Sequence, residues 1–341
     1  MSNFRDRLRP YKRWLQHQMS GSPLEFENST LPWIDRPDAD IDAFLKTFSV
    51  PDNFPYDLSE KLHFWKKNGY VILEDAIPKE WCDRLWEEVE DTVENNTKHS
   101  IIGEVKHYKN SQEIPIKNIP KEFLKGVGAR LFEYHNSSVG TKRMATVPAI
   151  ATFLEAIFTQ PVALYQSLIF RYSSQQEIHQ DFPWVRSSFP SHLAASWIPL
   201  EDVDPDSGPL FYYPGSHKMP KFNFGSGILY TRGESLKTPD DFSKYLQKTC
   251  EENGLEKAVL LLKKGDALIW HAALAHGGSL INDKKKTRKS LVCHYTTLES
   301  YPKHRYETND SSVTHIYNSI AVHSNPQNLA EEDCLSGGKN W

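Results

Sequence analysis

In the first half of the chain, apolar residues recur at the spacing of α-helices. One run follows Pro78 and another follows Pro148, and proline is well suited to the first turn of a helix. A shorter helix is predicted between an acidic cap at Asp57 and a glycine stop at Gly69, and residues 70–73 then read as a strand. The apolar positions of the two longer runs are Trp81, Leu85, Val89 and Val93, and Ile150, Phe153, Leu154, Ile157 and Phe158.

From Pro161 onward the pattern changes to short apolar stretches separated by clusters of Asp, Pro, Gly and Ser. The strands predicted there are 162–172, 192–200, 210–213, 258–262, 267–271 and 291–296. Many short strands after a helical prelude predict an α+β protein with a mainly β core, a sandwich or jelly roll with helices packed outside.

The remaining segments complete a single domain of 341 residues. Residues 1–56 are expected to form an arm over the core, with a short helix near 11–19. Residues 221–256 interrupt the strands with a helix near 240–250, and the pattern is equally consistent with a lid and with a passive surface insertion. The polar tail, residues 301–341, is expected to cover the barrel mouth or to pack against a partner.

Composition narrows the function classes. The chain is 39% hydrophobic and 25% charged, and its net charge of −4 argues against a general nucleic-acid binder. No stretch approaches the ~18 apolar residues of a membrane span, and the first residues do not resemble a secretory signal. The four cysteines lack Cys-x-x-Cys spacing, so neither a disulfide framework nor a structural zinc site is indicated, and a cytoplasmic setting is expected.

Three residues predict a metal site. His179 and Asp181 are separated by one residue, so on an extended strand their side chains point the same way. The best third ligand is His276, 97 residues on, where an apolar strand ends before two glycines that let the backbone turn sharply. A His/Asp/His triad leaves three positions free on an octahedral metal, which suits non-haem Fe(II) and oxygen chemistry.

A cation near these ligands extends the prediction to a cosubstrate. Arg288 follows His276 by twelve residues, and an arginine can hold the far carboxylate of a keto acid through a two-pronged ion pair. Lys289 is the rival, but the planar guanidinium has the better geometry for a carboxylate, so Arg288 is predicted. Ser290 lies on the same strand face as Arg288 and can donate a further hydrogen bond.

These motifs, taken in order over roughly residues 61–300, resemble the phytanoyl-CoA dioxygenase family. The resemblance is carried by His179-Gln180-Asp181, Trp197-Ile198-Pro199-Leu200-Glu201-Asp202-Val203, Ser207-Gly208-Pro209-Leu210, Pro214-Gly215-Ser216-His217-Lys218, Lys264-Gly265-Asp266, His276-Gly277 and Arg288. It implies a double-stranded β-helix, a cupin-like jelly roll, and an oxygenase that uses Fe(II), 2-oxoglutarate and O2.

The resemblance also implies residue roles. His179, Asp181 and His276 are expected to bind iron, and Arg288 the 5-carboxylate of 2-oxoglutarate. Trp197 matches a position that can line the cosubstrate pocket, and weaker candidates for that pocket are Gln166 and Gln180. In related halogenases a small residue replaces the carboxylate ligand, so Asp181 favours hydroxylation.

Other residues near the motifs are weighed between substrate binding and structure. Candidates for substrate contact are Arg186, His192, Tyr230 and Arg232. Three further histidines are interpreted as structural: His271 as buried and hydrogen-bonded, His217 as holding a turn, and His294 as a satisfied core histidine. The substrate is expected to be a small molecule, and the absence of an adenine- or phosphate-binding motif disfavours a coenzyme A ester.

Two other classes remain open from the sequence. A cupin-like zinc hydrolase or isomerase can use the same three ligands, but that interpretation leaves Arg288 without a task. A non-catalytic binding module has little reason to keep all three ligands. The oligomeric state is undetermined.

Overall fold

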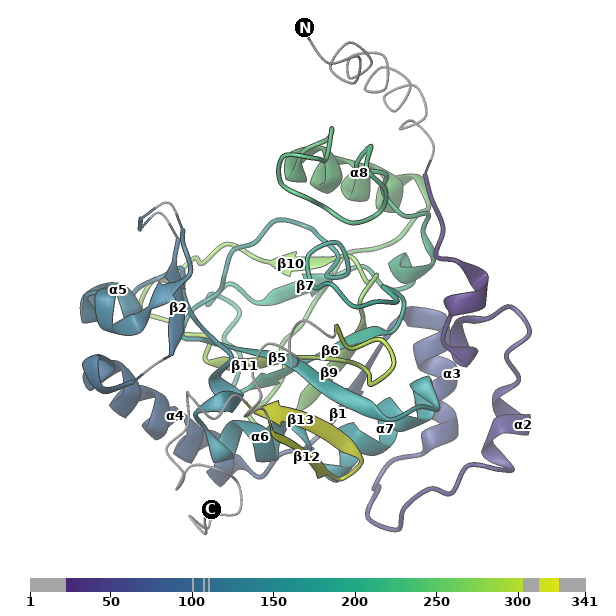
Figure 1. Cartoon of the computed structure of the whole chain (residues 1–341), viewed down its shortest axis with the longest axis horizontal. Coiled ribbons are helices and arrows are strands. Elements are labelled where there is room, and N and C mark those ends of the chain that lie inside the picture. Colours follow the sequence, from purple (N-terminus) through teal and green to yellow (C-terminus); the bar gives the residue numbers. More distant parts are fainter. Residues whose placement is uncertain (1–22, 100, 107, 110, 303–312, 325–341) are drawn as a thin grey trace, which may run out of the picture.

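The computed structural model describes residues 23–302, apart from 100, 107 and 110, and residues 313–324. The predicted helix near 11–19 lies outside the described residues. Two β-sheets form the centre of the protein, with helices packed around them (Figure 1). The large sheet runs in the order β1-β9-β6-β11-β5-β4-β2-β3, and the β12–β13 hairpin joins it at β5.

The strands of the large sheet come from distant parts of the chain. Every pairing between them is antiparallel except that of β13 with β5. The strands are β1 (Tyr70–Leu73), β2 (Ile102–Val105), β3 (Ile114–Pro115), β4 (Ala129–Phe132), β5 (Val162–Phe170), β6 (Leu193–Pro199), β9 (Ala267–His271), β11 (Ser290–Thr297), β12 (Val313–Tyr317) and β13 (Ile320–Ser324).

The small sheet faces the central strands of the large one, as expected of a jelly roll. It has the order β10-β7-β8, with β7 (Leu210–Tyr212), β8 (Ala258–Val259) and β10 (His276–Gly278). A mainly apolar cluster that includes Leu210, Trp197 and Leu268 fills part of the space between the sheets, and a cavity takes up another part.

Helices cover the outer face of the large sheet, and α8 lies above the small sheet (Figure 1). The α-helices of the described residues are α2 (Ile41–Leu45), α3 (Leu58–Asn68), α4 (Lys79–Glu94), α5 (Lys121–Leu124), α6 (Val139–Ala145), α7 (Pro148–Phe158) and α8 (Pro239–Glu252). Short 3-10 turns lie at Asn28–Thr30, Trp33–Asp35, Asn96–Lys98, Ile116–Asn118, Tyr134–Asn136 and Ser216–Lys218. The caps of α3 follow the sequence: Asp57 accepts from the Glu60 backbone N–H, and Gly69 ends the helix at φ +78°.

The central strands are buried on both faces, because helices cover one face and the cavity side covers the other. This explains why 162–172 and 291–296 read as nearly continuous apolar runs rather than as alternating ones. The sequence showed no such apolar run at four short strands, β2, β3, β4 and β10, and they were not predicted. Strand β8 was predicted but spans only two of the five residues expected.

The insertion between β7 and β8 packs against the loop that carries His179 and Asp181. The Ser243 hydroxyl donates to the Ile178 carbonyl over 2.9 Å, and the Tyr230 backbone N–H donates to the Pro183 carbonyl over 3.2 Å. A cluster of aromatic and aliphatic side chains fills the space beneath α8. The insertion is therefore fastened on both sides of this loop.

None of the described helices is long and apolar enough to cross a bilayer. The three cysteines within the described ranges are buried and free.

Candidate metal centre and cosubstrate pocket

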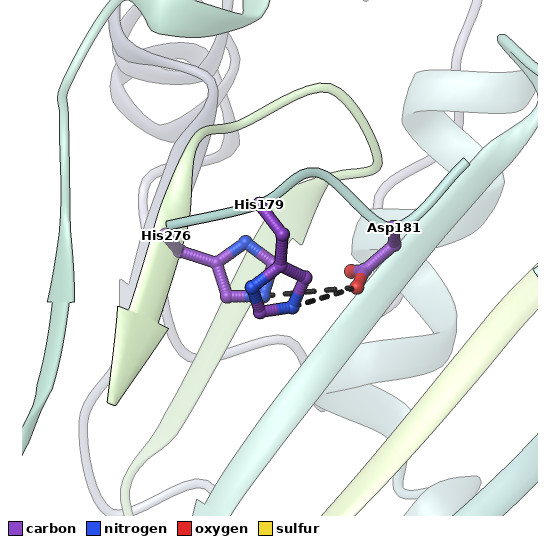
Figure 2. Close-up of side chains that lie close together, drawn as sticks. All are labelled: His179, Asp181 and His276. Atoms are coloured by element: carbon purple, nitrogen blue, oxygen red, sulfur yellow. Dashed lines mark ion pairs between the residues drawn. The ribbon is translucent and has the colours of Figure 1, made fainter. Parts of the chain in front are cut away.

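Strand pairing brings His179 and His276 together. The two residues form an isolated antiparallel bridge, with backbone bonds of 2.8 and 2.9 Å in the two directions. Their rings lie 4.3 Å apart, and Asp181, two residues beyond the bridged His179, reaches the same point because its backbone N–H donates to the Ala272 carbonyl. Figure 2 shows both imidazoles turned toward the Asp181 carboxylate.

The distances suit a single ion. Asp181 Oδ1 lies 3.7 Å from Nε2 of His179 and 3.7 Å from Nε2 of His276, and one ligand atom from each residue lies within 4.8 Å of the others. Each histidine donates its Nδ1–H to the carbonyl two residues before it, Glu177 or Leu274, over 2.8 and 2.9 Å. This leaves the Nε2 lone pairs facing Asp181, as metal binding requires.

Electrostatics keep these groups in their ligating forms. Burial, together with the neighbouring His276, lowers the pKa of His179 to about 3, so its imidazole is neutral. Burial alone raises the pKa of Asp181, but His276 and His294 outweigh it and the pKa lies below its usual range. A neutral imidazole beside an ionised carboxylate is the donor set that a divalent metal takes.

A tryptophan and a further histidine lie beside the outer oxygen of Asp181. The Trp270 indole N–H donates to Oδ2 over 2.8 Å, and His294 Nε2 lies 3.5 Å from the same atom. The sequence favoured a satisfied core position for His294, and that prediction is wrong. His294 is buried but lines the cavity, and apart from the contact with Asp181 its ring nitrogens have no hydrogen-bond partner among the described residues.

The cavity holds about 480 Å³ and runs from the histidines to Arg288. Arg288 is 5% exposed and makes no ion pair within the described ranges. Its one hydrogen bond found there runs from Nη1 to the Gly208 carbonyl over 2.9 Å. Burial lowers its pKa to about 10, so it remains charged at neutral pH. A buried, unpaired guanidinium in a cavity calls for an anion.

Arg288 rather than Lys289 faces inward, as predicted. The Lys289 ammonium turns away and pairs with Glu201 at 3.2 Å. Two further polar groups lack partners in the described part of the chain. One is the indole N–H of Trp197, whose ring lies 5.6 Å from the guanidinium, and the other is the hydroxyl of Ser290, which follows Arg288 by two residues but does not line the cavity. Together with the Arg288 Nε–H, they are buried donors for which the described residues supply no acceptor.

Gln166 lines the cavity, as predicted, but Gln180 does not. The Gln180 side chain is fully buried and donates to the Ala273 carbonyl. On an extended segment it points away from its neighbours His179 and Asp181, so the expectation that it binds the cosubstrate is wrong.

The four candidates for substrate contact do not line the cavity. Arg186 donates to the Tyr230 carbonyl over 2.7 Å and thereby holds the insertion in place. His192 is buried with its Nδ1 3.2 Å from the Thr297 hydroxyl, and Arg232 is exposed. Tyr230 lies one layer behind Trp184, with a ring separation of 4.7 Å, and it is Trp184 that reaches the cavity.

The rival histidines are structural, as expected. His271 is buried, accepts from the Ala273 backbone N–H and lies 3.3 Å from Asp35. His217 is buried in the 3-10 turn, where a side chain at Gly69 would collide with its ring.

Sequence reasoning missed several residues of the cavity wall. Arg130 and Phe132 come from β4, in the stretch without a clear pattern, and Gln176 precedes the first histidine. Trp184 follows the metal motif by three residues, and its position there was the one available signal.

A jelly roll whose cavity joins a His/Asp/His cluster to an unpaired arginine defines a class, the oxygenases that depend on Fe(II) and 2-oxoglutarate. Comparison with known proteins agrees. The family model "Phytanoyl-CoA dioxygenase (PhyH)" matches residues 65–290, and the chain belongs to this family.

The relatives are distant but extend over most of the chain. "Phytanoyl-CoA dioxygenase, peroxisomal" of Homo sapiens is 24% identical over 279 residues, covering 74% of this chain and 73% of the relative. "Probable phytanoyl-CoA dioxygenase" of Caenorhabditis elegans is 22% identical over 268 residues, covering 70% and 74%.

Solved structures share the fold. EctD from S. alaskensis, with 2-oxoglutarate and 5-hydroxyectoine, matches with a TM-score of 0.55 at 17% identity and covers 82% of this chain and 86% of that one. The epimerase SnoN from nogalamycin biosynthesis, in complex with Fe3+, alpha ketoglutarate and nogalamycin RO, matches with a TM-score of 0.51 at 18% identity, covering 72% and 86%.

Proposed function

We propose that this enzyme hydroxylates an unactivated C–H bond of a small molecule and releases succinate and CO2. The observation that carries the proposal is the joining of two features in one cavity. A His/Asp/His cluster lies at one end, and the buried, unpaired Arg288 lies at the other. A zinc hydrolase needs the first feature but has no use for the second.

His179, Asp181 and His276 would hold the iron. The fit is supported by the chemistry of the donor set, with two Nε2 atoms and one carboxylate oxygen converging while both Nδ1–H groups are used elsewhere. When bound with 2-oxoglutarate and O2, iron supplies the oxidation of the C–H bond. The balance is one substrate, one 2-oxoglutarate and one O2 giving one alcohol, one succinate and one CO2.

Arg288 would bind the 5-carboxylate of 2-oxoglutarate. One of its neighbours, the Trp197 indole N–H, is a buried donor that a carboxylate would satisfy. Because Arg288 is already buried without a counter-ion in the described structure, binding of a carboxylate relieves a desolvation cost that the folded chain carries. The protein's remaining task is to position the substrate and keep water from the reacting atoms.

The test uses the anaerobic protein with Fe(II) and 2-oxoglutarate and records the visible metal-to-ligand charge-transfer band. The band is expected in the wild type and in Lys289→Ala, which removes the neighbouring cation that faces away. It is expected to weaken strongly in Asp181→Ala and Arg288→Ala.

Two results would count against the proposal. A protein that shows no band and retains zinc tightly would point to the hydrolase class. A band that Arg288→Ala leaves unchanged would show that another group holds the cosubstrate. Once the band is established, succinate release during a screen of small molecules, followed by mass detection of a product heavier by one oxygen, tests hydroxylation itself.

A further inference from the structure

A second cavity adjoins the main one. It holds about 260 Å³ and shares four wall residues with the main cavity: Arg130, Phe170, Ser174 and Gln176. Because the two spaces have this wall in common, we call the second one the side chamber. Neither the metal cluster nor Arg288 contributes to its lining.

The side chamber is built by strands that extend the large sheet beyond β5. The register pairs Glu104 with Arg130 and Arg130 with Phe170, so these three side chains form one row across the sheet. Arg130 donates from Nη2 and Nε to a Glu104 carboxylate oxygen over 2.7 and 3.2 Å, and its guanidinium lies 4.8 Å from the Phe132 ring. These contacts hold the wall in one arrangement before any ligand enters.

The lining of the side chamber is polar and carries one surplus positive charge. Arg130 and Glu104 neutralise each other, whereas Lys106, which is exposed, makes no ion pair with any described residue. The hydroxyl of Ser174 and the amide of Gln176 add hydrogen-bonding groups. A hydrocarbon tail would desolvate these groups without replacing their hydrogen bonds, whereas an anion would gain from the lysine.

Other residues of the main cavity wall are apolar. Phe132, Leu168 and Val185 line it, and so does Trp184, which is 37% exposed. Tyr230 packs at 4.7 Å behind that indole and is itself fixed by backbone bonds. A large aromatic surface held open in a cavity is suited to an apolar molecule.

We propose that the substrate has an apolar body, which lies against Trp184, and a single anionic tail, a carboxylate or a phosphate, which enters the side chamber near Lys106. This rests on the proposed oxygenase function and deepens it. A coenzyme A thioester fits poorly, because its several phosphate charges meet one unpaired cation here and the exposed Glu113 also lines the cavity.

The experiment titrates the anaerobic protein, loaded with Fe(II) and 2-oxoglutarate, with four molecules that share a phenylbutyl body. They are 4-phenylbutyrate, 4-phenylbutyl phosphate, 4-phenylbutanol and 4-phenylbutylamine, and binding is measured by calorimetry. At least one anion is expected to bind about tenfold more tightly than the alcohol, as one charge-assisted hydrogen bond predicts. The two anions distinguish a carboxylate tail from a phosphate tail.

Lys106→Glu is expected to remove that preference, and Lys117→Glu is the matched control. Lys117 is exposed and lines neither cavity, so the same charge change there should leave the preference intact. Equal binding of all four molecules, binding of none, tightest binding of the amine, or a preference that survives Lys106→Glu would overturn the proposal. The charge-transfer band in the same samples reports separately whether the cofactors are bound.

A second inference is carried by a different contact. The Trp270 indole N–H donates to Asp181 Oδ2 over 2.8 Å, while Oδ1 faces both histidines. We infer that Trp270 is a positioning residue that restricts Asp181 to one coordinating oxygen. Hydrogen bonds to ligating carboxylates typically change metal affinity by about 10- to 100-fold.

Trp270→Phe keeps an aromatic side chain but removes the indole N–H together with part of the ring volume, and a matched Trp→Phe change elsewhere controls for that volume. The expected results are Co(II) affinity weaker by about tenfold or more and a shifted charge-transfer band. Trp65→Phe is the control, because Trp65 is equally buried but its indole N–H has no partner in the described structure. If Trp270→Phe binds Co(II) like the wild type and leaves the band in place, Trp270 only packs and the inference fails.

Discussion

Replacing Arg288 with methionine should stabilise the apo protein while abolishing cosubstrate binding. The guanidinium is 5% exposed, its Nε has no partner, and no carboxylate of the described residues pairs with it. A site shaped to receive an anion holds an uncompensated charge until the anion arrives, so the folded chain carries a cost that methionine would remove.

The magnitude follows from burial. Desolvation lowers the pKa of Arg288 from 12.5 to about 10, which corresponds to a penalty of about 3 kcal/mol on the charged form. Loss of the hydrogen bond to the Gly208 carbonyl costs about 1 kcal/mol. Methionine is unbranched and fills irregular space, so a net gain of about 1–2 kcal/mol in the free energy of unfolding is expected.

The assay is urea denaturation of apo protein, repeated with Mn(II) and 2-oxoglutarate in place of the reactive iron. Ligand that binds the folded state raises the midpoint of the wild type, and no such rise is expected in Arg288→Met. Lys289→Met removes a cation that pairs with Glu201 outside the cavity, so its stability should change by less than about 1 kcal/mol and its response to 2-oxoglutarate should persist. A destabilised Arg288→Met variant, or one that 2-oxoglutarate still stabilises, would refute the reasoning.

Three further outcomes are expected. His276→Ala removes one of the converging nitrogens, so the protein should lose Fe(II) on gel filtration while its circular dichroism spectrum is retained. Gln180→Leu removes a buried donor to Ala273, so urea denaturation should show a loss of about 1–3 kcal/mol while KM for 2-oxoglutarate stays within about twofold, since the side chain lies outside the cavity. Arg186→Met breaks the bonds that hold Tyr230 and its neighbour, so amide hydrogen exchange in residues 228–236 should become faster.

The metal site could be predicted from the sequence because the types of its ligands and their spacing within short segments are visible there. Alternation on an extended segment already aligned His179 with Asp181, and a strand followed by glycines marked His276. What the sequence could not show is that His179 and His276 pair directly in an isolated bridge, because pairing between residues 97 apart depends on the fold as a whole. Only that pairing explains why the rings converge.

The wrong expectations came from judging residues by their position near a motif rather than by the direction of their side chains. Gln180 was a pocket candidate because of its neighbours, yet the alternation that aligns the two ligands also turns the residue between them away. Arg186 drew attention through its charge, but its guanidinium reached backbone and hydroxyl groups of the insertion, so it supports the wall without touching the cavity. Charge near a motif is a weaker guide than the direction of the side chain.

Part of the cavity wall comes from a stretch with no clear sequence pattern, and the fold explains why. Strand β4 alternates Ala129 and Leu131 toward the core with Arg130 and Phe132 toward the cavity. A cavity face must present both polar and aromatic groups, so the polar-to-apolar alternation that identifies a strand is lost where binding is most specific. The two histidines and Asp181 lie on short motifs that the sequence shows directly, whereas Arg130 and Phe132 reach the cavity only through the pairing of β4 with β5.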